Sequence, residues 1–146
     1  MNWKDVEWIR SLWPGKLIIK GILDIEDARL AAKTGATALV VSNHGRRQLD
    51  GAASSISMLP RVVDAVGSEI EVMFDGGIRT GQDVLRALAL GAKSCLIGRA
   101  YIFGLAAGGE AGVARAIDIL SKELDVSMAL AGIRRIDEIG RHVLAG

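Results

Sequence analysis

Short apolar runs alternate along the chain with segments whose apolar residues recur at helical spacing. Four of the runs are too short and too rich in β-branched residues to be helices. They are Lys16–Lys20, Ala38–Ser42, Ile70–Asp75 and Ser94–Gly98. Continuous apolar runs of this length indicate strands that are buried on both faces, as in parallel sheets.

The segments between and around these runs carry the periodicity and the terminal signals of helices. Asp24 and Thr80 are the expected N-caps, and Asp83 follows Thr80 at the spacing of a capping box. Pro14 and Gly15 are expected to end the first helix. The expected helices are Trp3–Trp13, Asp24–Lys33, Ser57–Val66, Thr80–Leu90, Glu110–Leu130 and Ile136–Leu144.

Strand and helix alternate throughout, so the sequence predicts an α/β fold of βα units around a parallel sheet. An internal repeat supports this, because one constant offset pairs Gly21 with Gly77 and Gly35 with Gly91. Four βα units are half of a TIM (β/α)8 barrel, which needs about 250 residues in full. An open doubly wound sheet is the alternative that the repeat leaves open. The predicted single domain spans 1–146, with βαβα modules at about 16–66 and 70–105 and closing helices over 109–145.

Composition narrows the class of protein. The 146 residues are 50% hydrophobic, which is enough for one domain with a core. With 18 Lys and Arg against 17 Asp and Glu, no electrostatic reason favours nucleic acid or an anionic membrane as a partner. The single cysteine, Cys95, predicts a reducing cytoplasmic compartment and is expected to be a small core residue. No signal peptide, membrane segment or metal site is predicted.

Candidate chemistry is concentrated where the predicted strands end. Parallel α/β folds place their active sites at the carboxyl ends of the strands. In this chain every one of those ends carries a polar, charged or glycine cluster. The clusters are Lys20–Gly21, Ser42–Arg47, Asp75–Arg79 and Gly98–Ala100. Because the four ends share one rim, they can converge on one ligand.

The third and fourth clusters predict a phosphate site. Gly76–Gly77 and Gly98 would let backbone N–H groups approach an anion, and Arg79 and Arg99 supply planar donors that suit phosphate. Asp75 would repel a phosphate placed beside it. Its carboxylate is therefore expected to accept hydrogen bonds from sugar-like hydroxyls, or alternatively to pair with an arginine.

The second cluster predicts the reacting groups. His44 follows a buried strand and is positioned to act as a general base, although a lone histidine is more often structural. Arg47 would bind a substrate carboxylate through two hydrogen bonds. Lys20 ends the first predicted strand, where it would face a ligand or extend into solvent. Asp50 is expected to cap a loop or, alternatively, to orient a neighbouring side chain.

These clusters resemble the signatures of the FMN-dependent 2-hydroxy-acid oxidases and dehydrogenases, such as glycolate oxidase, L-lactate dehydrogenase, (S)-mandelate dehydrogenase and flavocytochrome b2. The resemblance covers nearly the whole chain and corresponds to the C-terminal half of that family's barrel. It is carried by Ser42-Asn43-His44-Gly45-x-Arg47-Gln48-Leu49-Asp50, by Asp75-Gly76-Gly77-Ile78-Arg79-x-Gly81-x-Asp83 and by Leu96-Ile97-Gly98-Arg99.

The resemblance implies FMN as cofactor and oxidation of an (S)-2-hydroxy acid, similar to lactate or mandelate, to the 2-oxo acid. His44 would be the catalytic base and would bind substrate together with Arg47. Whether His44 deprotonates the hydroxyl or the α-carbon stays open. Lys20 and Ser42 would contact the flavin ring system. The ribityl chain and phosphate would be held by Asp75, Gly76, Gly77, Ile78, Arg79, Gly98 and Arg99.

Two features depart from the family. Arg46 stands where the family usually has a small residue, so it would either crowd the substrate or face the rim. The second departure is the absence of the family's first four βα units, which supply the substrate-binding tyrosines. Any membrane-anchoring insert would also lie outside this chain.

A half-barrel alone would expose two sheet edges and an apolar inner face, so we expect a partner. The partner would be the N-terminal half-barrel or a second copy of the chain, in a homo-oligomer. Three hypotheses follow. The chain is part of a complete flavoenzyme and inactive alone; it is a self-associating half-barrel that binds FMN or phosphate without turnover; or it is an assembly module whose motifs are unused.

Overall fold

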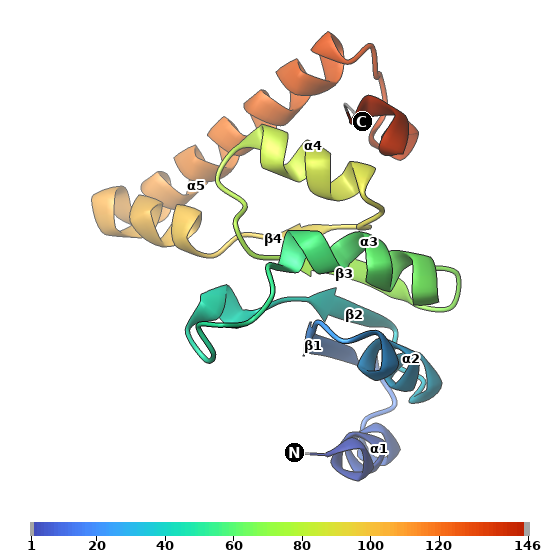
Figure 1. Ribbon diagram of the computed structural model, residues 1–146. Coiled ribbons are helices and arrows are strands. Elements are labelled where there is room, and N and C mark those ends of the chain that lie inside the picture. The colour runs from blue at the N-terminus through green and yellow to red at the C-terminus, as the bar shows by residue number, and fades with distance from the viewer. Residues whose placement is uncertain (1, 145–146) are drawn as a thin grey trace.

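The computed structural model describes residues 2–144 (Figure 1). One parallel sheet contains the strands β1 (Ile18–Ile22), β2 (Ala38–Val41), β3 (Glu71–Asp75) and β4 (Cys95–Leu96). The helices are α1 (Trp3–Leu12), α2 (Ile25–Lys33), α3 (Ser55–Val66), α4 (Gly81–Ala89) and α5 (Arg99–Leu130). Three short 3₁₀ turns complete the described chain: η1 (His44–Arg46), η2 (Ile136–Glu138) and η3 (Arg141–Val143).

The strand order decides between the two predicted architectures. The sheet runs β1-β2-β3-β4, so strands that are neighbours in sequence are neighbours in space. A doubly wound sheet would reverse this order at a switch point. Because crossovers between parallel strands are right-handed, an unreversed order puts their helices on one face. In Figure 1, α2, α3 and α4 indeed follow one another along the sheet from β1 to β4. The fold is the predicted open half of a barrel.

The core lies between the sheet and these helices. Its strand residues alternate with residues of the opposite face, as the pleat requires. On β2, Leu39 and Val41 belong to the core, whereas Ala38 and Val40 point to the opposite face of the sheet, where both are also buried. The core comprises Ile22, Leu39, Val41, Val72 and Phe74 of the sheet, Ala28 and Ala31 of α2, Leu59, Val62 and Val66 of α3, and Ala87 of α4, with Ile70, Ile78 and Ala92. Both edge strands have one partner each within residues 2–144.

A bulge at Gly21 changes the predicted first strand. Lys20 is in register with Val40 and Ile22 with Val41, so Gly21 is an extra residue in β1. Its φ of +104° is a conformation that suits glycine. The strand therefore continues two residues beyond the predicted end, and Lys20 lies inside it. The prediction that Lys20 ends the strand is wrong for this reason.

The predicted helix starts at Asp24 and Thr80 are confirmed. The Asp24 side chain accepts hydrogen bonds from the backbone N–H groups of Glu26 and Asp27. Thr80 accepts from the Asp83 N–H, and the Asp83 carboxylate accepts from the Thr80 N–H, which is a reciprocal capping box. The short polar side chains therefore fix where α2 and α4 begin.

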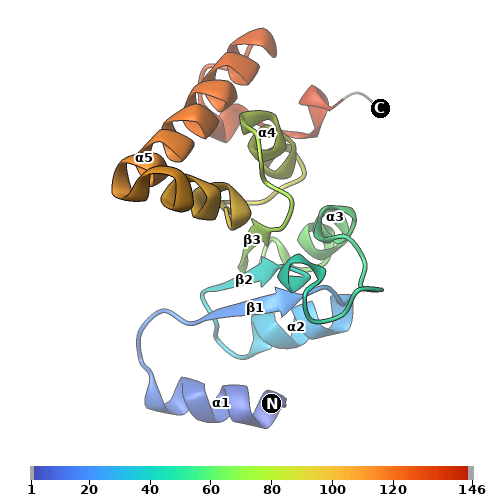
Figure 2. The same cartoon turned by 90° about the vertical axis from the view of Figure 1, so that its left-hand side faces the viewer.

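Helix α5 consists of two helical segments that meet at a kink, where Gly108 and Gly109 leave helical geometry. The segment after the kink is the predicted helix Glu110–Leu130, whereas the segment from Arg99 to the kink was not predicted. Gly104 and Gly112 meet backbone to backbone beside the interruption, where an added Cβ on either would overlap the carbonyl of the other. This glycine contact lets the second part of α5 turn back and pack along α4, as both views show (Figures 1 and 2).

The predicted terminal helix over Ile136–Leu144 is wrong. Ile139 and Gly140 are extended and separate two 3₁₀ turns, η2 and η3. Arg141 in η3 pairs with Asp64 on α3, with 2.5 Å between Nη2 and Oδ1. Glycine is a poor helix former, and here it overrides the apolar periodicity around it. No helix within residues 2–144 is both long and apolar enough to cross a membrane.

Candidate functional site

A cleft of about 250 Å³ opens at the carboxyl ends of the strands. Residues from all four strand ends contribute to its wall. The lining residues are Lys20, His44, Gly45, Arg47, Asp75, Gly76, Gly77, Ile78, Arg79, Leu96, Gly98, Arg99 and Ile102. The fold thus brings together every predicted site residue except Ser42. Ile102 was not predicted; it is an apolar residue in the first turn of α5 with no motif to mark it.

Ser42 lies beneath the cleft and links three of its residues. The residue is 1% exposed. Its hydroxyl accepts hydrogen bonds from Lys20 Nζ at 2.9 Å and from the His44 backbone N–H at 3.1 Å. The same hydroxyl donates to Asp75 Oδ2 at 3.0 Å. Ser42 therefore holds the ends of β1, β2 and β3 in one arrangement from below.

Lys20 and Asp75 form an ion pair across the inner face of the sheet. Their side chains are 39% and 21% exposed, so both remain accessible from the cleft. Of the two expectations for Asp75, an ion pair is the one present, with a lysine rather than an arginine as partner. Since this pair is neutral overall, Arg47, Arg79 and Arg99 leave the cleft with an excess of positive charge that favours an anionic ligand.

A tight loop presents His44 at the cleft. His44 and Gly45 have φ values of +53° and +67°. Asn43 stabilises the loop, because its Oδ1 accepts from the Gly45 N–H at 3.1 Å and its Nδ2 donates to the Ala53 carbonyl at 3.1 Å. A non-glycine residue in the left-handed region is strained, and such residues occur often at active sites.

Gly21 provides the space for the His44 imidazole. A Cβ added at Gly21 would lie 2.5 Å from His44 Cε1. Any side chain at position 21 would therefore displace the ring. The sequence analysis placed Gly21 in the internal repeat and in the first cluster, but it did not predict the contact with His44, because the close approach depends on the bulge in β1.

Arg46 adopts the left-handed conformation that its position requires, with φ of +61°. A non-glycine residue in this region costs about 1 kcal/mol or more. We expect Arg46→Gly to raise the melting temperature by about 2–4 °C, measured by circular dichroism. Arg47→Gly is the matched control, because Arg47 has a φ of −77° and should gain nothing. Equal or lower stability of Arg46→Gly would contradict the strain.

The ends of β3 and β4 have the features of a phosphate site. Added Cβ atoms at Gly77 and Gly98 would meet nothing within 4 Å, so their backbones are open to a ligand. Helix α5 begins at Arg99 without a side-chain cap, which leaves its first N–H groups available to an anion. Within residues 2–144, the guanidinium groups of Arg79 and Arg99 have no hydrogen-bonding or ion-pair partner. These donors fit a phosphate.

The size of the cleft limits what the chain can hold. Sites that enclose a whole cofactor measure roughly 300–1,000 Å³. At about 250 Å³, this cleft is smaller than such a site, so it would leave part of a large cofactor uncovered.

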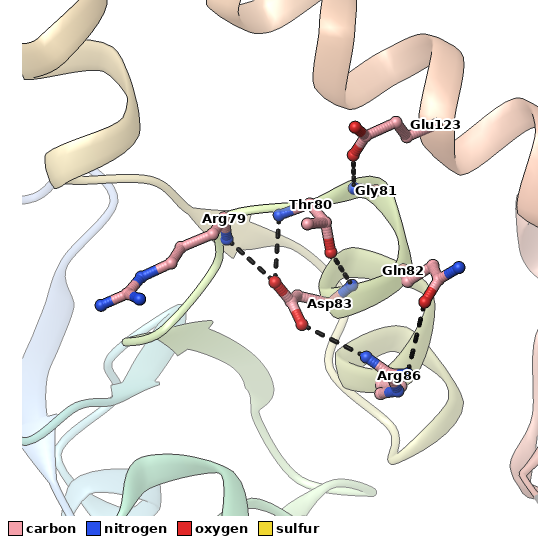
Figure 3. Close-up of polar contacts among 7 residues, drawn as sticks. All are labelled: Arg79, Thr80, Gly81, Gln82, Asp83, Arg86 and Glu123. Atoms are coloured by element: carbon pink, nitrogen blue, oxygen red, sulfur yellow. Dashed lines mark hydrogen bonds and ion pairs between the residues drawn. The ribbon is translucent and has the colours of Figure 1, made fainter.

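Asp83 organises the backbone that carries Arg79 (Figure 3). Its Oδ2 accepts hydrogen bonds from the N–H groups of Arg79 and Thr80, each at 3.0 Å. Its Oδ1 faces Arg86 Nη1 at 3.3 Å. Partial burial raises the pKa of Asp83, but these backbone and side-chain hydrogen bonds and the Arg86 charge outweigh it, so the pKa lies below its ordinary value of 3.8.

The lowered pKa predicts how stability depends on pH. The Asp83 carboxylate stabilises the folded chain above pH 3.8, and this contribution is lost as the pH falls through the lower folded value. We expect Asp83→Asn to lower the free energy of unfolding at pH 7 by about 1 kcal/mol, measured by urea denaturation. The difference in the free energy of unfolding between Asp83→Asn and the wild type should narrow below pH 4. A gap that is constant with pH would show that the charge of Asp83 does not matter.

Cys95 is not a candidate nucleophile. Burial raises the pKa of its thiol to about 11, so the thiol stays protonated near neutral pH. Its side chain packs partly against the core, in line with the expectation for it. No group of three or more His, Cys, Asp or Glu within residues 2–144 is placed to hold a metal ion.

Comparison with known proteins identifies relatives along the whole chain. A family model described as FMN-dependent dehydrogenase matches residues 1–146. An L-lactate dehydrogenase of Azorhizobium caulinodans is 58% identical over 146 residues, which is 100% of this chain and 38% of the relative. One of Stenotrophomonas maltophilia is 56% identical over 144 residues, 99% of this chain and 38% of the relative. The chain thus spans little more than a third of these proteins.

Solved structures agree with the sequence comparison. A crystal structure of mandelate oxidase superposes with a TM-score of 0.93 at 46% identity. The superposed region covers 97% of this chain and 43% of the mandelate oxidase chain. The structure of (S)-mandelate dehydrogenase, described as a monotopic membrane protein, superposes with a TM-score of 0.95 at 41% identity. The superposed region covers 99% of this chain and 38% of the mandelate dehydrogenase chain.

Proposed function

Because the chain belongs to the FMN-dependent dehydrogenase family, we propose that it supplies the catalytic base and the flavin-phosphate site of an enzyme that oxidises a 2-hydroxy acid to a 2-oxo acid. FMN is the cofactor of this family. The observation that carries the proposal is the cleft that His44 and Arg47 line together with the open glycines and the arginines that follow β3 and β4. The names of the relatives favour a substrate similar to lactate or mandelate.

His44 and Arg47 would act on the substrate. Arg47 would bind the carboxylate, because a guanidinium matches its two oxygens. Oxidation removes two electrons and two protons as the C–H and O–H bonds break and the C=O bond forms. His44 would take one of the protons on its imidazole, which lies at the mouth of the cleft against Gly21. FMN, when bound, would accept the two electrons together with the other proton.

The remaining residues of the cleft would hold the cofactor. Gly77, Gly98 and the first N–H groups of α5 would bind the phosphate, with Arg79 and Arg99 on either side of it. Asp75, Gly76 and Ile78 would contact the ribityl chain. Lys20 would lie near the ring, where its cation can stabilise negative charge, and Ser42 would position Lys20 through the hydrogen bond between them.

The chain would need a partner to complete the site. The relatives are much longer, and within residues 2–144 β1 and β4 each have one edge without a neighbouring strand. We propose that the partner is the other half of the barrel, within one longer protein that assembles as a homo-oligomer. The protein would be cytoplasmic. If the whole protein attaches to a membrane, a segment outside this chain would make the attachment.

Turnover measurements test this proposal. The chain alone is expected to oxidise lactate and mandelate at no more than background rates. A chimera, in which this chain replaces the 146 matching residues of the Azorhizobium relative, should be active with bound FMN. Steady turnover by the isolated chain would contradict the need for a partner. A yellow dimer of the isolated chain on a sizing column, without turnover, would favour the self-associating half-barrel instead.

A further inference from the structure

We propose that Glu123 on α5 is a positioning residue for the phosphate site, an inference that rests on the function proposed above. Its Oε2 accepts a hydrogen bond of 2.8 Å from the N–H of Gly81, the first residue of α4. Figure 3 shows the Glu123 side chain reaching from α5 to the start of α4, next to the loop that carries Arg79. Glu123 thus links α5, which begins at Arg99, to the start of α4, which follows the loop that carries Arg79.

The contact between the two helices is close at this point. Gly81 is buried, and an added Cβ would overlap the backbone of Glu123 and Leu124. The amino end of α4 therefore rests directly on the backbone of α5, and the Glu123 carboxylate fixes its position along that helix. Arg79 is only two residues before Gly81, so its backbone is held by the same contact.

The other arginine of the site is on α5 itself. Arg99 begins this helix, and the interruption at Gly108 and Gly109 turns the second part of it back along α4. The first segment of α5 carries Arg99, and the second segment, which meets the first backbone to backbone at Gly104 and Gly112, holds the start of α4 with Glu123. We infer that the bond from Glu123 to Gly81 sets the separation between the two guanidinium groups.

Glu123 also determines where an anion binds. The N–H groups of Arg79 and Thr80 donate to Asp83, and that of Gly81 donates to Glu123. These successive donors at the amino end of α4 are all taken by carboxylates, whose charge would repel a phosphate. The anion is thereby directed to the uncapped start of α5 and to the open glycines beside it.

The test compares FMN with riboflavin, which lacks the phosphate, by fluorescence titration of the purified chain. The measured quantity is the ratio of the riboflavin dissociation constant to that of FMN. We expect Glu123→Ala to lower this ratio by about 5- to 10-fold with riboflavin binding unchanged. Glu123→Gln keeps an oxygen acceptor and should stay within about twofold of the wild type. Asp125→Ala, at an exposed position on the same helix, is the matched control.

The outcomes separate the inference from the function on which it rests. Equal weakening of FMN and riboflavin by Glu123→Ala would indicate a merely structural role and overturn the inference. A ratio of dissociation constants that Glu123→Ala leaves unchanged would overturn the inference as well. If Glu123→Ala does not fold, Glu123→Asp, whose carboxylate is one methylene shorter, should lower the ratio in the same direction. A wild-type ratio near 1 would instead contradict the phosphate site itself.

Discussion

Replacing His44 by Ala in the chimera is expected to lower the turnover of lactate or mandelate by about 10²- to 10⁴-fold. This is the range that a positioned general acid or base contributes. The bound FMN should be retained, because the imidazole is not among the groups proposed to hold the phosphate. Steady-state kinetics and the flavin absorbance spectrum of the same samples measure both quantities.

His142 provides the matched control, since it is the other histidine of the chain and is exposed in η3. Its replacement by Ala should leave turnover within about twofold of the parent. Unchanged turnover of His44→Ala with a full complement of flavin would eliminate His44 as the base. Loss of the flavin together with activity would show that the His44 loop serves cofactor binding instead.

Replacing Arg79 or Arg99 by Ala is expected to weaken FMN binding by the isolated chain about 10- to 100-fold each. Hydrogen bonds to charged groups contribute about 1.5–3 kcal/mol, and 1.4 kcal/mol is a factor of ten. Binding of riboflavin should change little, because it has no phosphate. Arg99→Lys should give an intermediate loss, since lysine keeps the charge but not the planar pair of donors.

Arg61 is a suitable control for this comparison, because it is exposed on α3 outside the residues that line the cleft. Arg61→Ala should bind FMN as the wild type does. If Arg61→Ala weakens FMN as much as Arg79→Ala, binding depends on overall charge and not on the cleft. If Arg79→Ala and Arg99→Ala both bind FMN normally, the phosphate lies elsewhere.

The parts of the fold that could be predicted from the sequence are those with local causes. Asp24 and Thr80 begin α2 and α4 because a short polar side chain satisfies the first N–H groups of the helix. The β2 run over Ala38–Val41 is buried throughout, as an apolar strand between two neighbours should be. Because parallel strands end on one rim, the predicted residues at their tips meet in one cleft.

The features that the sequence did not predict depend on contacts between distant residues. The bulge at Gly21 follows from the register between β1 and β2 and from the ring of His44. The pairing of Lys20 with Asp75 joins side chains from β1 and β3. The bend in α5 requires Gly104 to meet Gly112. Apolar periodicity carries no information on such contacts.

Nuclear magnetic resonance of the ¹⁵N-labelled chain, titrated with FMN, tests the central claim most directly, because it locates the ligand on the chain. The site described above predicts that the largest shifts occur at the backbone amides of Gly77, Gly98 and Arg99, and that inorganic phosphate shifts the same amides. Shifts confined to other parts of the chain, or none at millimolar FMN, would contradict a flavin-phosphate site at the ends of β3 and β4.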